Sequence, residues 1–105
     1  MITLTPEAAE QMLTAAKQSN AEGLPLRIAV QRREDGSFQY GMGFEDNRRE
    51  NDLLFSSAGI AVVVSPVSLE LLKGTVVDFV EFEPGQCQFI FLNPNDPNYQ
   101  PANKA

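Results

Sequence analysis

The chain has 105 residues, of which 43% are hydrophobic and 21% charged, a composition typical of one soluble globular domain. Its formal net charge of −6 argues against direct nonspecific binding to nucleic acid or to anionic membranes, because both depend on Lys and Arg side chains. One cysteine and no histidine exclude an internal disulfide, a cysteine-based zinc site and the usual bases and nucleophile activators of enzymes. We therefore expect neither catalysis nor a bound cofactor or metal.

The N-terminal segment predicts a short strand followed by an amphipathic helix. The strand is expected at Ile2–Leu4. Thr5 offers a side-chain oxygen that can cap a helix, and Pro6 suits the first helical position. Apolar residues then recur at three- and four-residue spacing, which is typical of a helix that packs on a sheet. The helix should run from about Pro6 to Gln18.

A change to a two-residue apolar period predicts a hairpin in the next segment. Apolar and mostly polar residues alternate over 26–31, as in a half-buried strand. Asp35 and Gly36 form a strong hairpin-turn pair, and the return strand is expected over 37–44. Residues 45–52 are polar or charged throughout and predict a mobile loop.

The remaining elements are short strands and a second helix. Ser65 and Pro66 together predict a helix start, and Gly74 marks its end. The expected strands span residues 53–55, 60–64, 75–82 and 86–92. This order of elements predicts a compact α+β domain dominated by antiparallel strands.

Four segments carry a family resemblance. They are the opening ITLTPEAAEQM, the spaced Tyr40-x-Met42-x-Phe44, the run GIAVVVSPVSLELLKGTVVDFV and the terminal FLNPN. In their order and spacing the chain is similar to the A-type iron–sulfur carriers of the HesB/IscA/SufA family. The resemblance implies a HesB/IscA-like, β-sandwich-like fold of mainly antiparallel strands with two flanking helices. It implies a domain over residues 1–95 and leaves a flexible tail at 96–105.

The resemblance also implies that the cluster ligands of the family are missing. Members of that family hold a cluster with three cysteines, and the corresponding positions here are Asp35, Gln100 and Ala102. Cys87 lies where the family has no ligand. Because a free cysteine is most often a small buried hydrophobe, Cys87 is expected in the core of the final strand.

The chain resembles, in particular, cysteine-less family members that accompany the reverse dissimilatory sulfite reductase system of sulfur oxidation. That resemblance implies a noncatalytic accessory or regulatory protein that acts through an unidentified protein partner. We expect a cytoplasmic monomer. The candidate interaction surface consists of Arg32, Arg33, Asp35, Arg48 and Arg49. An ordinary solvated loop remains the simpler interpretation of each of these charged residues.

A second hypothesis gives the chain an accessory role in iron or iron–sulfur assembly through weak carboxylate binding of metal. Oxygen ligands suit hard cations, and five acids could meet if the hairpin and the loop after it folded together. They are Asp35, Glu45, Asp46, Glu50 and Asp52. The sequence spacing does not show whether these side chains converge.

Overall fold

The computed structural model describes residues 2–45 and 51–97 of the chain. Within these residues the elements follow the order β1 (Thr3–Leu4), α1 (Pro6–Gln18), β2 (Leu26–Arg32), β3 (Phe38–Phe44), β4 (Leu53–Ser57), β5 (Ile60–Val64), α2 (Pro66–Leu72), β6 (Val76–Glu83) and β7 (Gln86–Leu92). The α+β class and the two helices are confirmed. The loop expected to be mobile lies largely outside the described residues, at 46–50.

Both helices begin where the sequence predicts. The Thr5 hydroxyl accepts a hydrogen bond from the Ala8 amide at 3.1 Å, and proline occupies the first turn of α1. Ser65 caps α2 in the same way, accepting from the Ser68 amide at 3.3 Å. In each case a side-chain oxygen satisfies a backbone amide that has no partner within the helix. Neither helix of the described part is long and apolar enough to cross a membrane.

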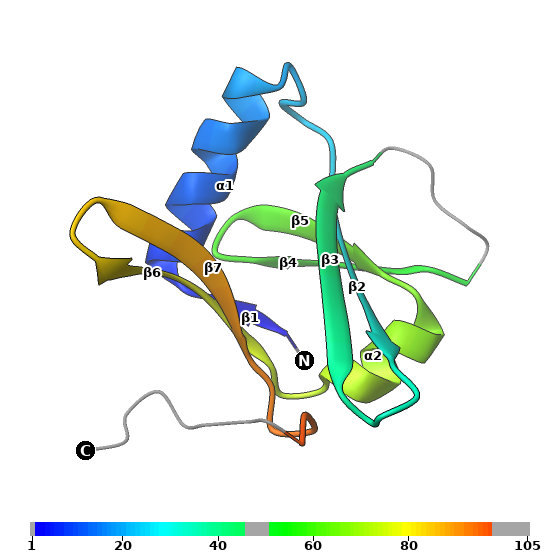
Figure 1. The fold of residues 1–105 in the computed structure, drawn as a ribbon. Helices are drawn as coiled ribbons and strands as arrows, with labels where there is room; N and C mark the ends of the chain where they lie inside the picture. Colours follow the sequence, from blue (N-terminus) through cyan, green and yellow to red (C-terminus); the bar gives the residue numbers. More distant parts are fainter. Residues whose placement is uncertain (1, 46–50, 98–105) are drawn as a thin grey trace.

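The strands form two sheets, which Figure 1 shows on opposite sides of the molecule. One sheet has the order β1-β6-β7 and the other β3-β2-β5-β4. Sequential neighbours pair antiparallel, whereas β1 pairs with β6 and β2 with β5 in parallel. The Leu4 amide donates to the Ser57 hydroxyl at 2.9 Å and so connects the first sheet to β4 of the second.

The core lies between the sheets and under α1. On β2 the alternating residues Leu26, Ile28 and Val30 are buried, which confirms the predicted two-residue period. Val62 and Val64 on β5 are fully buried beside them. The Tyr40, Met42 and Phe44 side of β3 packs against this core as a partly buried layer.

Two tight turns depend on left-handed backbone. At the β2–β3 turn Gly36 has a φ of 89°, as the Asp-Gly pair predicts. At the β4–β5 turn Ala58 and Gly59 have φ values of 51° and 83°. Positive φ at both central residues is the geometry of a two-residue hairpin whose twist matches the strands. Ala58 occupies that conformation with a side chain that disfavours it.

Candidate functional site

The tip of the β2–β3 hairpin carries three of the residues predicted as an interaction surface. The Arg33 amide donates to the Ser37 carbonyl at 2.7 Å, and the Gly36 amide donates to the Arg33 carbonyl at 2.9 Å, which closes the turn. Asp35 accepts hydrogen bonds from the Ser37 amide at 2.9 Å and from its hydroxyl at 2.6 Å. These bonds, with a smaller contribution from the positive charge of Arg33, lower the pKa of Asp35 below its ordinary value.

The arginines of the tip remain accessible. Arg32 lies with its guanidinium carbon 5.4 Å from the centre of the Phe38 ring, a cation–π arrangement that orients the side chain. Arg32 and Arg33 are both exposed, and neither forms an ion pair with another residue of the described part. Arg48 and Arg49 lie outside the described residues, so the structure does not bring the two arginine pairs together or separate them.

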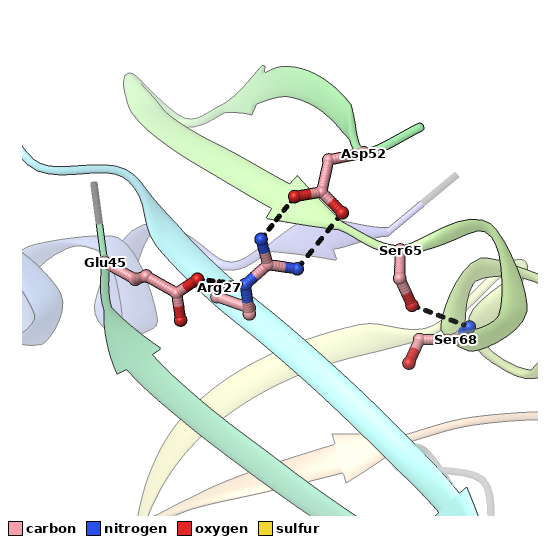
Figure 2. Close-up of polar contacts among 5 residues, drawn as sticks. All are labelled: Arg27, Glu45, Asp52, Ser65 and Ser68. Carbon is pink, nitrogen blue, oxygen red and sulfur yellow. Dashed lines mark hydrogen bonds and ion pairs between the residues drawn. The ribbon is translucent and has the colours of Figure 1, made fainter. Parts of the chain in front are cut away.

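A charged cluster that the sequence did not predict lies at the other end of this hairpin (Figure 2). Arg27, on β2, donates through Nε to Glu45 at 3.0 Å, through Nη1 to Asp52 at 3.3 Å, and through Nη2 to the other oxygen of Asp52. The Asp52 side chain is 1% exposed and that of Arg27 12% exposed. The paired guanidinium thus holds together the residue that follows β3 and the residue that precedes β4.

The electrostatics of this cluster favour the ion pairs. Hydrogen bonding to Asp52, followed by that to Glu45 and the charges of both acids, raises the pKa of Arg27 even though burial opposes the charged form. The sequence did contain a signal: Arg27 lies inside a partly apolar strand, and acids stand at both ends of the loop 45–52. Pairing over 25 positions depends on the fold and could not be read from spacing alone.

This arrangement does not bring the three described acids of the carboxylate metal hypothesis to one point. Glu45 and Asp52 bind Arg27, whereas Asp35 lies at the opposite end of the seven-residue strand β3. Because a strand rises about 3.4 Å per residue, the two ends are too far apart to share one ion. Asp46 and Glu50 lie outside the described residues. Among the residues that the structure describes, no three His, Cys, Asp or Glu side chains are placed to hold a metal.

A second network joins β3 to the segment after β7. The Tyr40 ring stacks on Phe91 with the ring centres 4.4 Å apart and the planes 5° apart. The Tyr40 hydroxyl donates to the Asp96 carboxylate at 2.6 Å and accepts from the side-chain amide of Asn93 at 3.3 Å. Asn93 is fully buried and also donates to the Leu71 carbonyl at 2.8 Å. Asp96, expected in the flexible tail, is therefore bonded to a strand of the opposite sheet.

Comparison with known proteins decides the family. The iron–sulphur cluster biosynthesis family matches residues 1–100. The chain belongs to this family. It is 34% identical over 94 residues to the iron–sulfur cluster insertion protein ErpA of Xylella fastidiosa, a match that covers 90% of this chain and 73% of that protein.

Solved structures of the family share the fold. IscA, crystallised with its 2Fe–2S cluster, superposes with a TM-score of 0.71 at 32% identity, over 90% of this chain and 86% of that one. Escherichia coli SufA, described as involved in biosynthesis of iron–sulfur clusters, gives a TM-score of 0.73 at 28% identity, over 99% and 90%. The HesB/IscA-like fold is thus confirmed, and the chain, whose relatives are named for inserting or building clusters, is not an enzyme.

The function expected from the sequence is wrong. The family members that match are named for inserting or building clusters, and one was crystallised with a cluster, which contradicts a cluster-free regulator of sulfur oxidation. The narrower resemblance to cysteine-less members is not confirmed, since this chain retains Cys87. The error came from treating the loss of ligand residues as the loss of the family's role.

Cys87 is exposed, which corrects its expected burial. It lies on the face of β7 that continues through Phe89 and Phe91, so the alternation was read correctly. However, all residues from 81 to 88 are exposed, because this end of the β6–β7 hairpin extends beyond the residues that cover the rest of the face. Gln100 and Ala102, the other positions compared with family ligands, lie outside the described residues.

The donor set of the chain does not match the needs of an iron–sulfur cluster. Such clusters take about four ligands, normally thiolates, because iron in this form prefers soft sulfur donors. The whole chain supplies one sulfur of that kind, Cys87, and no histidine. At the hairpin tip the carboxylate of Asp35 is already engaged by Ser37.

Proposed function

We propose that the chain acts in iron–sulfur cluster delivery, as a carrier or insertion protein whose cargo is the cluster. The observation that supports this most directly is the family match over residues 1–100. It agrees with the 34% identity to a cluster insertion protein across 90% of the chain. The partners of such a protein are the proteins that release the cluster and those that accept it.

The hairpin tip supports a docking role within that function. Arg32 and Arg33 are exposed cations beside the exposed acids Glu34 and Asp35, and their guanidinium groups can pair with carboxylates of a partner. Asp35, at the same turn, corresponds by resemblance to a cluster ligand of the family. We therefore assign partner contact to Arg32, Arg33 and Asp35, and on sequence grounds also to Arg48 and Arg49.

Cluster-transfer kinetics test this function. A cluster-loaded donor and an apo ferredoxin acceptor are mixed anaerobically, and acceptor loading is followed by visible circular dichroism with and without substoichiometric chain. We expect the chain to accelerate loading. An unchanged rate at every chain concentration would reject the delivery role.

Charge variants test the docking surface. The variant Arg33→Glu should lower the transfer rate in a salt-dependent manner. Lys17→Glu is the matched control, because Lys17 is an exposed cation near the C-terminal end of α1, which Figure 1 shows far from the β2–β3 turn. Equal loss of rate in the two variants would show that net charge acts rather than the hairpin tip.

A further inference from the structure

The strand β3 directs a row of backbone groups away from its neighbour β2. At the two ends of the β2–β3 ladder, the Arg33 amide donates to the Ser37 carbonyl at 2.7 Å and the Glu45 amide to the Pro25 carbonyl at 3.0 Å. The antiparallel register between these ends is continuous. Because opposite residues of such a ladder alternate between bonded and non-bonded pairs, the even-numbered residues of β3 turn their N–H and C=O groups away from β2. They are Phe38, Tyr40, Met42 and Phe44.

The hydrogen bonds of β2 agree with this alternation. Val30, the register partner of Tyr40, donates its amide to the Ser68 hydroxyl at 3.2 Å rather than to β3. On its other side β3 has no neighbour, since it is the last strand of its sheet in the described part of the chain. The outward groups of β3 therefore form a free edge, a row of donors and acceptors with which a further strand can pair.

This edge lacks the features by which proteins usually prevent such pairing, namely charged side chains, proline, bulges or a very short strand. The seven residues of β3 include no charged residue and no proline, and they pair with β2 without a bulge. On the outer face Gly41 and Gly43 carry no side chains, and a Cβ at either position would meet no atom of the described residues within 4 Å. A second backbone can thus approach β3 closely.

A cleft beside the edge indicates which side chains an added strand should carry. It has a volume of about 340 Å³ and is lined by Met42 and Phe44 of β3, Phe89 of β7, and Met12 and Ala15 of α1. Figure 1 shows β3 and β7, each at the edge of its sheet, diverging on either side of this region. Because side chains of a strand alternate between faces, every second side chain of an added strand would face the apolar cleft.

The charge at one end of the edge adds a further requirement. Arg32, the register partner of Phe38, is exposed and holds its guanidinium carbon 5.4 Å from the centre of the Phe38 ring. A carboxylate at this end of an added strand would lie beside that cation and pair with it. A second copy of the chain is a poorer occupant, because two molecules of net charge −6 repel each other.

We propose that the free edge of β3 binds an extended segment of another protein, which joins the sheet as an additional strand. The segment carries apolar side chains at alternate positions, which enter the cleft, and an acidic residue at the end beside Arg32. Backbone hydrogen bonds supply the affinity, and the cleft and the arginine supply the specificity. This binding goes beyond the delivery role and does not depend on it.

Amide hydrogen exchange followed by NMR tests the free edge. The probe is a soluble peptide of alternating valine and threonine with glutamate at both ends. In the free chain the Gly41 and Gly43 amides should exchange slowly and those of Tyr40 and Met42 fast, because only the first two bond to β2. Saturating probe should slow exchange at Tyr40 and Met42 by about tenfold or more.

Three outcomes of this measurement would overturn the proposal. The first is slow exchange of Tyr40 and Met42 already in the free chain, which would mean that the edge is covered by the chain itself or by a second copy. The second is no change on adding the probe. The third is protection along β7, the edge strand across the cleft, in place of β3.

Two N-methylated forms of the probe test whether it binds as a strand. One carries the methyl groups on its valine amides and the other on its threonine amides. Because each edge of a strand uses the amides of alternate residues, only one form should lose affinity, by about tenfold or more. Loss in the valine form indicates antiparallel pairing. Equal affinities of the two forms would contradict binding through one strand edge.

A pair of lysine variants tests the cleft. Met42→Lys places a charge in the apolar cleft and should weaken probe binding by about tenfold. Gln39→Lys is the matched control, because Gln39 lies on the exposed outer face of the same strand and its replacement should not weaken binding. Circular dichroism verifies that both variants fold, and the uncharged Met42→Ser is used if Met42→Lys does not. Equal weakening by both replacements would reject the cleft as the side-chain site.

A glutamine-for-glutamate probe tests the acidic end. It should bind more weakly than the parent probe at low salt, with the difference shrinking as salt is added. Equal binding of the two probes would reject the contact with Arg32. None of these measurements involves a cluster, so a chain that fails to accelerate cluster transfer yet binds the probe would lose only the delivery role. A chain that accelerates transfer without binding the probe would lose only this inference.

Discussion

Arg27 occupies an environment in which its charge is required. Its side chain is 12% exposed, and the Asp52 carboxylate that it binds is 1% exposed. Arg27→Met keeps the apolar stem but removes the guanidinium that binds the buried Asp52 carboxylate, which should lower the free energy of unfolding by about 3 kcal/mol. Urea unfolding followed by far-ultraviolet circular dichroism measures the change.

The control for Arg27 is a surface pair. Lys73 lies 3.4 Å from Glu70, and both side chains are more than half exposed. Lys73→Met should therefore change the free energy of unfolding by less than about 0.5 kcal/mol. Similar losses in the two variants would mean that burial does not set the strength of the Arg27 ion pairs.

Tyr40 should resist ionisation at high pH. Burial, and then the hydrogen bond to Asp96, raises the pKa of the Tyr40 phenol above its ordinary value of about 10. Because the pKa is higher in the folded state, the stabilisation is complete below about pH 10 and is lost as pH rises through the folded pKa. Absorbance titration of the Tyr99→Phe variant, which isolates Tyr40, should show no phenolate near pH 10.

Removing the phenol should remove that pH dependence. Tyr40→Phe keeps the ring that stacks on Phe91, so it should unfold with a smaller fall in stability above pH 10 than the wild-type chain. Denaturation midpoints of both proteins between pH 8 and pH 11 give the comparison. Parallel curves would show that another group controls stability in this range.

At the level of single elements, Ala58 in the β4–β5 turn has a strained backbone conformation that a substitution can relieve. Ala58 has a φ of 51°, and asparagine tolerates that conformation better than alanine. Ala58→Asn should therefore raise the free energy of unfolding by about 0.5–1 kcal/mol, visible as a higher Tm in calorimetry. Ser56→Asn, in the regular part of β4, should give no such gain. A gain at both positions would assign the effect to asparagine itself.

Local chemistry explains which elements the sequence predicted well. Pro6 and Pro66 follow capping hydroxyls, and Asp35 precedes the Gly36 turn, so the information lies within a few neighbouring residues. The charged cluster of Arg27 could not be predicted in this way, because its partners are brought close only by the pairing of β2 with β3 and β5. The strand alternation gives the face on which a residue lies but not whether that face is covered.

The candidate site was predicted only in part for the same reason. The tip residues Arg32, Arg33 and Asp35 follow from the turn, and the structure describes them at one hairpin end. The exposure of Cys87 depends on how far the β6–β7 hairpin extends past its neighbours, which no local pattern encodes. The family role was misjudged because the loss of the ligand residues was taken as the loss of that role.

For the whole molecule, the monomer stays a prediction. A net charge of −6 opposes close association of identical chains. Sedimentation velocity of the reduced protein should give one species whose mass does not change with concentration. A dimer that persists on dilution would contradict this. Added salt provides the control, since it screens the repulsion and should not by itself create a specific dimer.

The parallel pairing of β1 with β6 has a consequence for the order of events during biosynthesis. Thr5 binds Asp78, 73 positions later, and Thr3 is in register with Val76. A growing chain lengthens by roughly 5–20 residues per second, so the first strand waits for about 4–15 s until its neighbour has been made. During that interval Ile2 and Leu4 have no sheet to complete. β1 is thus synthesised early but can join its sheet only after β6, at Val76–Glu83, has been made.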